Sequence, residues 1–224
     1  MSLVLRLFQF NWLAAWRGLF LTVACCAFIS MGVYGLNASE PGRILIIGDS
    51  ITAGYNLPAE QAYPALLQQK IDREGLPFRI QNAGQSGDTT AGGLRRVHWL
   101  LRAGAPDVAV VALGGNDGLR GLDPAAMQSN LQGIVAALRE ANPNVQILLA
   151  GMRMPASMGA RYVRDFQAAF AAVVEQEGVD WLPFLLDGVA GEPSLNFDDR
   201  IHPNAAGQVI IAATVWKHLA PLLR

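Results

Sequence analysis

A serine and a histidine lie in two loop-like segments, each close to a carboxylate. Ser50 ends a Gly-Asp-Ser turn, and His202 precedes a proline, three residues after Asp199. Acyl transfer needs a hydroxyl nucleophile, an imidazole that takes its proton and a carboxylate that orients the imidazole. These residue types predict Ser50 as the nucleophile and His202 as the base. The orienting acid is Asp199 or its neighbour Asp198, because the spacing does not decide between them.

Each of these residues also has an ordinary structural interpretation. Gly-Asp-Ser is a common turn composition, and taken alone it favours the turn. The two adjacent aspartates are also typical of a solvated turn before a helix. The remaining histidines, His98 and His218, fall in predicted amphipathic helices, where we expect structural roles. Only His202 lies in a loop with the residue types that acyl transfer requires.

Acyl transfer also needs hydrogen-bond donors for the developing oxyanion. The backbone N–H groups of Ser50 and Gly87 and the side-chain amide of Asn116 are suitable donors. Glycines near these positions let the backbone approach a ligand closely, although turn formation alone would also explain them.

Short apolar runs alternate with helical patterns along the rest of the chain. The runs cover residues 44–47, 78–80, 108–113, 145–150 and 179–182. Strands that alternate with helices indicate βαβ units and a parallel sheet covered on both faces. We therefore expect an α/β fold, a three-layer α/β/α sandwich with a five-stranded parallel sheet. Ligands of such sheets bind at the carboxyl ends of the strands, and the polar clusters named above follow those ends.

Four of these polar segments, taken together and in this order along the chain, resemble the SGNH (GDSL-type) hydrolase family. The resemblance covers residues 43–224 and rests on Gly-Asp-Ser, Gly87, Gly-x-Asn-Asp and a terminal Asp-x-x-His. It implies a flavodoxin-like fold, Ser50 as nucleophile, His202 as base, and Gly87 and Asn116 as oxyanion-hole donors with Ser50. It also selects Asp199 over Asp198. Ile51 replaces the leucine of the family's name, an apolar change that affects no catalytic role.

Three further segments resemble the bacterial thioesterase I/protease I/lysophospholipase L1 and arylesterase branch of that family. These segments are 114–121 (GGNDGLRG), 152–155 and 159–162. The branch implies a serine hydrolase that acts on acyl esters and thioesters without a metal or organic cofactor. Two alternatives stay open: a deacetylase of envelope polysaccharide, or a catalytically silent, membrane-tethered binding module.

We expect four residues beside the catalytic groups to contact the substrate: Asp49, Leu119, Met154 and Pro155. Met152, Met154 and Met158 either line a flexible acyl groove or pack at a strand end. Leu119 and Leu122 either contact an acyl chain or cap their loop. Metal hydrolysis and nucleotide binding are poorer interpretations, because the chain has no His-Glu-x-x-His, phosphate-loop or Gly-x-Gly-x-x-Gly motif.

The composition separates an N-terminal segment from the rest of the 224 residues. The chain is 52% hydrophobic and 16% charged, with a net charge of -1, which excludes a charged disordered tail and disfavours nucleic-acid binding. Before Glu40 the only charges are Arg6 and Arg17, and residues 18–39 are uncharged, about the length that spans a bilayer. We expect residues 1–39 to be a signal peptide or an N-terminal membrane anchor, and residues 40–224 to be the hydrolase domain.

The expected location is the bacterial periplasm or cell envelope, with membrane contact only if the N-terminal segment is retained. The only two cysteines, Cys25 and Cys26, lie in that segment, so the domain has no internal disulfide and no thiolate metal site. We interpret these cysteines as small apolar residues rather than lipidation sites. We expect a monomer that acts on a small-molecule acyl ester or thioester.

Overall fold

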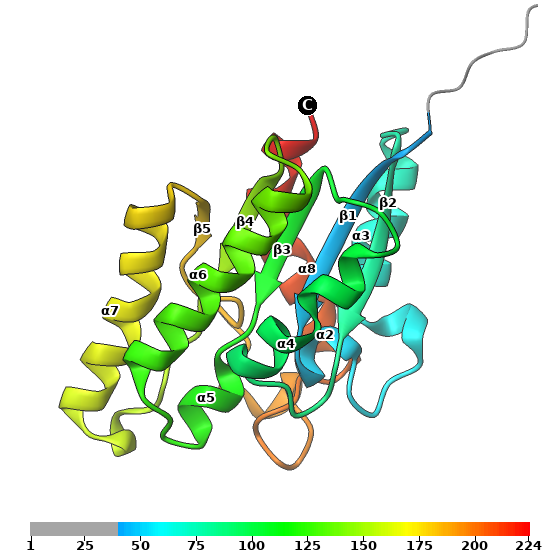
Figure 1. Cartoon of the computed structure of the whole chain (residues 1–224). Helices are drawn as coiled ribbons and strands as arrows, with labels where there is room; N and C mark the ends of the chain where they lie inside the picture. The colour runs from blue at the N-terminus through cyan, green and yellow to red at the C-terminus, as the bar shows by residue number, and fades with distance from the viewer. Residues whose placement is uncertain (1–39) are drawn as a thin grey trace, which may run out of the picture. The chain divides into compact units, whose positions relative to one another are not determined.

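Five short strands form one parallel sheet in the computed structural model, which describes residues 40–224 (Figure 1). The predicted N-terminal segment, with Cys25 and Cys26, lies outside the described residues. The sheet order is β2-β1-β3-β4-β5. The strands are β1 (Gly42–Gly48), β2 (Phe78–Gly84), β3 (Val108–Ala112), β4 (Gln146–Ala150) and β5 (Asp180–Leu182).

The two central strands are buried on both faces, as their composition requires. Ile44 to Ile47 in β1 and every residue of β3 are buried. Continuous Val and Ile runs of this kind are typical of parallel strands with helices on both sides. The strand order reverses between β2 and β3, on the two sides of β1. A crevice is therefore expected where β1 and β3 end.

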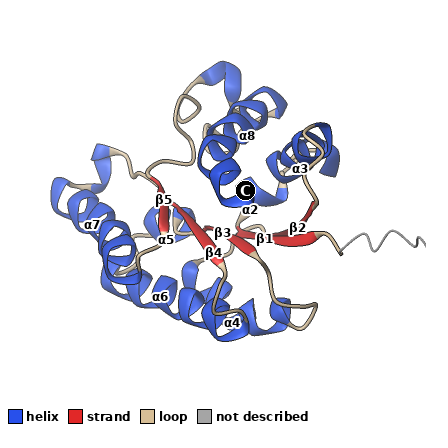
Figure 2. Ribbon diagram, turned by 90° about the horizontal axis from the view of Figure 1, so that it is seen from above, coloured by secondary structure: helices blue, strands red, loops and turns tan. Residues whose placement is uncertain are grey.

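Helices cover both faces of the sheet (Figure 2). The helices α2, α3 and α8 lie on one face, and α4, α6 and α7 lie on the other. The predicted three-layer α/β/α sandwich with a five-stranded parallel sheet is therefore confirmed. The helices are α2 (Ser50–Ala53), α3 (Tyr63–Arg73), α4 (Thr90–Leu101), α5 (Gly115–Leu119), α6 (Pro124–Ala141), α7 (Ala160–Glu177) and α8 (Ala205–Leu219). Four single 3₁₀ turns are η1 (Ala59–Gln61), η2 (Ala156–Met158), η3 (Pro193–Leu195) and η4 (Ala220–Leu223).

Most strands lie within one or two residues of the ends expected from the sequence, and two segments differ by more. β2 continues to Gly84, where only residues 78–80 were expected, because Asn82 to Gly84 pair in register with Ile46 to Gly48. Residues 115–119, expected as part of a polar loop, form the short helix α5. The pairing with β1, and not the side-chain pattern, determines the backbone of β2. The residues of α5 are mainly Gly, Asn and Asp, which have low helix propensity, so their types do not predict a helix.

Among the described residues, one segment is long and apolar enough to cross a membrane, namely Ala205–Leu223. It consists of α8 and η4, and α8 packs against α3 and β5. Ile211, Val215 and Leu219 on its inner face are buried in the core. We therefore describe it as a core helix of the domain.

Candidate active site

The candidate nucleophile lies where the central strand β1 ends. Ser50 is the first residue of α2, and the side chain of Asp49 caps this helix by accepting a hydrogen bond from the N–H of Ile51 at 3.0 Å. The turn before it requires glycine at position 48, because a Cβ there would lie 2.0 Å from Oγ1 of Thr52. The Gly-Asp-Ser sequence therefore forms a tight turn from strand to helix, which presents Ser50 at the sheet edge.

Ser50, His202 and Asp199 form a continuous hydrogen-bonded chain. Oγ of Ser50 is 2.9 Å from Nε2 of His202, although the two residues are 152 positions apart in the sequence. Nδ1 of His202 is 2.7 Å from Oδ2 of Asp199. This is the order of contacts that an activated serine requires, with the carboxylate holding the imidazole from the opposite side.

Asp199 is held in place by its own loop. Its Oδ1 accepts hydrogen bonds from the backbone N–H groups of His202 and Ile201, both at 2.9 Å. Donation from the backbone and the side chain of His202, and from the backbone of Ile201, lowers the pKa of Asp199 to about 2. The contacts to the imidazole fall on Asp199 and not on Asp198, the alternative that the spacing left open.

Asp49, the other carboxylate beside the nucleophile, is in a contrasting environment. Its side chain is almost completely buried, and this burial raises its pKa to about 6, although the N–H of Ile51 and the nearby His202 act in the opposite direction. Its side chain hydrogen-bonds to the backbone of α2. The geometry therefore supports a capping role, in addition to its position on the wall of the cleft described below.

Asn116 reaches the same edge of the sheet from the end of β3. Its side-chain amide donates a hydrogen bond to the carbonyl of Asp88 at 2.9 Å, which orients the amide against the loop between β2 and α4. Gly114, just before α5, has a φ of 110°, and a Cβ at this position would lie 2.8 Å from the ring of Phe170. The Gly-Gly-Asn-Asp sequence thus brings the amide close to the loop that contains Gly87.

Gly87 has a φ of 80°, and its carbonyl accepts a hydrogen bond from Nη2 of Arg120 at 2.9 Å. Its N–H makes no hydrogen bond to any of residues 40–224. A cleft at this edge of the sheet is lined by Ser50 and Asn116. Gly87 lies on the adjoining loop and is not part of the cleft wall.

Two sets of contacts that the residue types did not suggest hold this loop, one part-buried and one buried. Nε of Arg96 is 2.7 Å from Oδ2 of Asp88, and its Nη2 donates to the carbonyl of Gly48 at 3.0 Å. Asp117 accepts hydrogen bonds from the N–H and the hydroxyl of Thr90 at the start of α4. The ends of β1, β2 and β3 are therefore joined by side chains. The sequence does show charged residues within Gly-rich segments, but this pattern does not identify the residues that they contact.

A cleft of about 620 Å³ opens beside Ser50 and His202. The four residues expected to contact substrate, together with Met152, all belong to its wall, which is mainly apolar. Met158 and Leu122 are not part of this wall; Met158 packs against the core, and the carbonyl of Leu122 accepts from the hydroxyl of Tyr162 at 2.8 Å. The lining residues are Asp49, Ser50, Ile51, Gly115, Asn116, Leu119, Met152, Arg153, Met154, Pro155, Phe184, Leu186, Ala190, Gly191, Arg200, Ile201 and His202.

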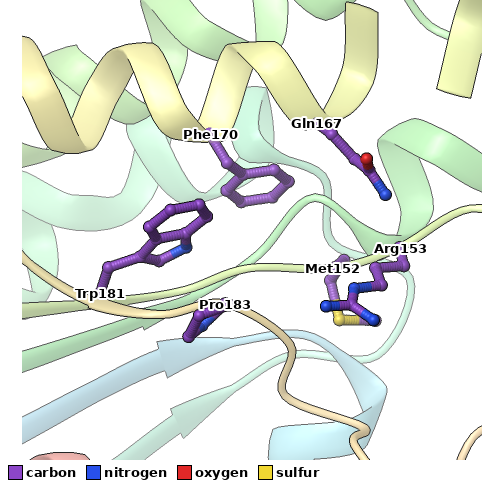
Figure 3. A pocket seen from close by; sticks show the side chains of 6 residues that line it. All are labelled: Met152, Arg153, Gln167, Phe170, Trp181 and Pro183. Carbon is purple, nitrogen blue, oxygen red and sulfur yellow. The ribbon is translucent and has the colours of Figure 1, made fainter. Parts of the chain in front are cut away.

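A second cavity, of about 390 Å³, lies between α7 and the segment after β5 (Figure 3). Gln167 and Phe170 point into it from α7, and Trp181 faces Phe170. Met152 and Arg153 line both cavities, so the segment after β4 separates one from the other. Ser50 and His202 belong to the first cavity alone.

Within residues 40–224, no group of three or more His, Cys, Asp or Glu side chains is arranged to hold a metal ion. The chemistry of the main cleft is that of the serine, the imidazole and the amide donors. A parallel α/β sheet with a hydrogen-bonded serine, histidine and aspartate at its carboxyl edge defines the class of the protein as a serine hydrolase.

Comparison with known proteins gives the family within this class. Residues 46–210 match the model of the GDSL-like Lipase/Acylhydrolase family, and the chain belongs to that family. It is 42% identical over 180 residues to Esterase TesA of Pseudomonas aeruginosa, covering 80% of this chain and 89% of that one. It is 37% identical over 196 residues to Thioesterase 1/protease 1/lysophospholipase L1 of Escherichia coli K12, covering 88% and 92%.

Solved structures agree with these relatives. A crystal structure of TesA superposes with a TM-score of 0.77 at 41% identity, covering 81% of this chain and 99% of that chain. The psychrotrophic esterase EstA from Pseudoalteromonas, inhibited by monoethylphosphonate, also has a TM-score of 0.77, at 34% identity, with coverage of 81% and 98%. The protein is therefore a serine hydrolase that acts on ester bonds, as the resemblance in the sequence indicated.

Proposed function

We propose that Ser50, His202 and Asp199 perform ester and thioester hydrolysis through an acyl-enzyme. The observation that carries the proposal is the hydrogen-bonded chain from Asp199 through His202 to Ser50, which opens into the cleft with the apolar wall. Esterase, arylesterase and thioesterase appear in the names of the relatives, which supports the same substrate class.

In the first half of the reaction, Oγ of Ser50 attacks the acyl carbonyl while Nε2 of His202 takes its proton. The N–H groups of Ser50 and Gly87 and the amide of Asn116 donate to the oxyanion, and Asp199 stabilises the imidazolium. The tetrahedral intermediate then collapses. The bond to the alcohol or thiol breaks, and this leaving group takes the proton from His202.

In the second half, water replaces the leaving group. His202 takes a proton from the water, whose oxygen attacks the acyl-enzyme, and the second tetrahedral intermediate releases the carboxylic acid. The proton returns from His202 to Oγ of Ser50. The net reaction consumes one water and needs no metal or organic cofactor.

The cleft supports an acyl group as the part of the substrate bound on its apolar wall. Met152, Met154 and Leu119 give this wall side chains that adapt to chains of different length, because methionine is unbranched and flexible. Asp49 and Pro155 also belong to this wall. The proposed substrate is a small molecule. The groups assigned to the reaction all come from one chain, so the proposed monomer contains every one of them.

A series of p-nitrophenyl esters and acyl-CoAs of increasing acyl length, assayed with the wild type and with Ser50→Ala, tests this function. We expect hydrolysis of both classes by the wild type only. Faster release of acetate from acetylated polysaccharide than from any ester of the series would favour an envelope deacetylase instead. Failure of Ser50 to react with a p-nitrophenyl phosphonate would favour a silent binding module.

We also propose that residues 1–39 export or anchor the enzyme, so that it acts in the bacterial periplasm or cell envelope. The uncharged run 18–39 beside Arg17 supports this. Cell fractionation followed by N-terminal sequencing tests it, since a cleaved signal peptide yields a shortened, released protein. Intact protein in the cytosolic fraction would contradict the proposal.

A further inference from the structure

Tyr55 lies against the imidazole of His202. The two ring centroids are 4.2 Å apart, and the planes are inclined by 30°. We propose that Tyr55 is a positioning residue, which holds the plane of the His202 ring and stabilises its positively charged form during catalysis. The proposal rests on the catalytic role of His202 given under Proposed function.

The turn that carries the nucleophile also fixes Tyr55. The N–H of Tyr55 donates to the carbonyl of Ser50 at 3.0 Å, directly after Gly54 ends α2 in the left-handed conformation. Asn56 follows with a φ of 57°, and the N–H of Leu57 donates to the carbonyl of Gly54 at 2.9 Å. An aromatic residue five positions after the serine is therefore folded back onto the partner of that serine.

Hydrogen bonds alone restrain one motion of the imidazole only weakly. The contacts at Nδ1 and Nε2 lie on opposite sides of the ring, so they fix the line that joins Asp199 to Ser50. The ring can still turn about this line, and such a turn misaligns both hydrogen bonds. A flat side chain packed on one face resists that motion.

The same contact favours the imidazolium that forms when His202 takes the proton of Ser50. The face of an aromatic ring carries negative charge, and a cation within about 6 Å of its centroid is attracted to it. The other charged groups at this site are Asp199, Asp49, Arg153 and Arg200. A substitution at Tyr55 removes none of them, so its effect can be assigned to the ring.

Tyr55 is placed to act through His202 rather than on the substrate. It is not part of the cleft wall, and 39% of its surface is exposed. Its hydroxyl makes no hydrogen bond to the part of the chain that the structure describes. The ring, and not the hydroxyl, is therefore the functional part.

The test compares Tyr55→Phe, which keeps the ring, with Tyr55→Leu, which keeps an apolar side chain without a π face. The readouts are kcat and KM on a short p-nitrophenyl ester and the rate of labelling by a p-nitrophenyl phosphonate. We expect Y55L to lower kcat and the labelling rate about 3- to 30-fold with KM unchanged, and Y55F to match the wild type. Wild-type kcat in Y55L, an equal loss in Y55F, or a change confined to KM would each overturn the proposal.

Two further measurements separate this role from a merely structural one. The ring protons of His202 should show a ring-current shift in the NMR spectrum that Y55F keeps and Y55L loses. Pentafluorophenylalanine at position 55 keeps the shape of the ring but removes its negative face, so we expect a loss of kcat there also, and wild-type kcat would contradict the electrostatic part. This variant also serves if Y55L does not fold.

Two controls keep the failure of this inference distinct from the failure of the proposed function. Trp99→Leu removes an exposed aromatic ring from α4, 66% exposed and outside the cleft wall, and should leave kcat unchanged. Ser50→Ala should be inactive whatever Tyr55 does. Activity in Ser50→Ala would refute the function, whereas an inactive Ser50→Ala beside a normal Y55L would refute only the role of Tyr55.

Discussion

The two carboxylates at the candidate site, Asp49 and Asp199, have pKa values that their surroundings shift in opposite directions. Burial raises the pKa of Asp49 to about 6, while N–H donors from its own loop lower that of Asp199 to about 2. Pairs of acidic groups that differ in this way mark a division of roles at an active site. Asp199 stays ionised to very low pH and can orient His202 throughout, so loss of activity at mildly acidic pH must come from another group.

Replacing Ser50 tests the proposed mechanism most directly. Ser50→Ala should lower kcat by about 10⁴- to 10⁶-fold, because the hydroxyl that forms the acyl-enzyme is lost while the cleft is kept. Steady-state assays with a p-nitrophenyl ester measure this, and unfolding by denaturant confirms that the variant is folded. Turnover near the wild-type rate would contradict the mechanism.

Asn116→Ala should lower kcat by about 10²- to 10³-fold, as expected for one donor of an oxyanion hole. The amide also donates to the carbonyl of Asp88, so the loop beside Gly87 loses a tether in the same variant. Arg120→Met serves as a comparison, because it removes only the tether at Gly87. A change in KM alone for Asn116→Ala would show that the amide positions the substrate without stabilising the oxyanion.

Asp49→Asn should stabilise the protein at pH 8. The pKa of Asp49 is about 6 in the folded state against 3.8 for an exposed aspartate, so folding favours the protonated form. Stability is therefore lost as the pH rises from about 4 to 6, and the loss is complete above that range. An asparagine cannot ionise and keeps the hydrogen bond from Ile51. We expect a gain of about 1–3 kcal/mol at pH 8, which disappears near pH 4; denaturant unfolding at both values measures it.

The residue types alone identified Ser50, His202 and the oxyanion donors as candidates, because acyl transfer requires a hydroxyl, an imidazole and N–H donors. They left Asp198 and Asp199 undecided, since two adjacent carboxylates have the same chemistry and only the loop conformation distinguishes them. Tyr55 was not identified. An aromatic residue in a turn has no chemical signature, and its partner is far away in the sequence.

At the scale of elements, the apolar runs predicted the strands well where burial is complete. β1 and β3 lie inside the sheet, and residues 44–47 of β1 and all of β3 are buried and apolar, so the pattern is clear. β2 is an edge strand with two exposed and four half-buried residues, and its second half was predicted as a polar turn. Its backbone is nevertheless fixed by pairing with β1, a constraint that no local pattern contains.

The buried side chain of Gln208 joins three helices. From α8, its Oε1 accepts from the N–H of Tyr63 at the start of α3 at 2.8 Å, and its Nε2 donates to the carbonyl of Ile51 in α2 at 3.0 Å. Gln208→Met keeps the volume but leaves two buried backbone groups unpaired, each costing about 1–3 kcal/mol. We expect a loss of about 2–5 kcal/mol in the free energy of unfolding.

Denaturant unfolding of Gln208→Met measures this loss, and Gln61→Met in the exposed turn η1 is the matched control, for which we expect no change in stability. Stability equal to the wild type in Gln208→Met would mean that the helices are held by apolar packing alone.

At the scale of the whole molecule, the hydrophobic excess and the near-neutral charge are averages over two unlike parts. Arg6 and Arg17 are the only charged residues before Glu40, and the remainder of the chain has more acidic than basic residues. The domain resembles an ordinary mildly acidic enzyme, and the apolar excess lies in the N-terminal segment. The interior of the domain is formed by residues between Ile44 and Leu223.

This division predicts that residues 40–224 are sufficient for folding and activity. A variant that begins at Glu40 should fold and hydrolyse p-nitrophenyl esters with unchanged kcat/KM. The core, the cleft wall and the hydrogen-bonded residues Ser50, His202 and Asp199 all lie within Pro41–Arg224. It should stay in the soluble fraction after cell lysis, whereas the full chain should pellet with membranes or appear shortened in the periplasm. Activity assays and fractionation measure both properties. A folded variant with reduced kcat/KM would mean that residues 1–39 contribute to the site itself, and would contradict their role as a signal or an anchor alone.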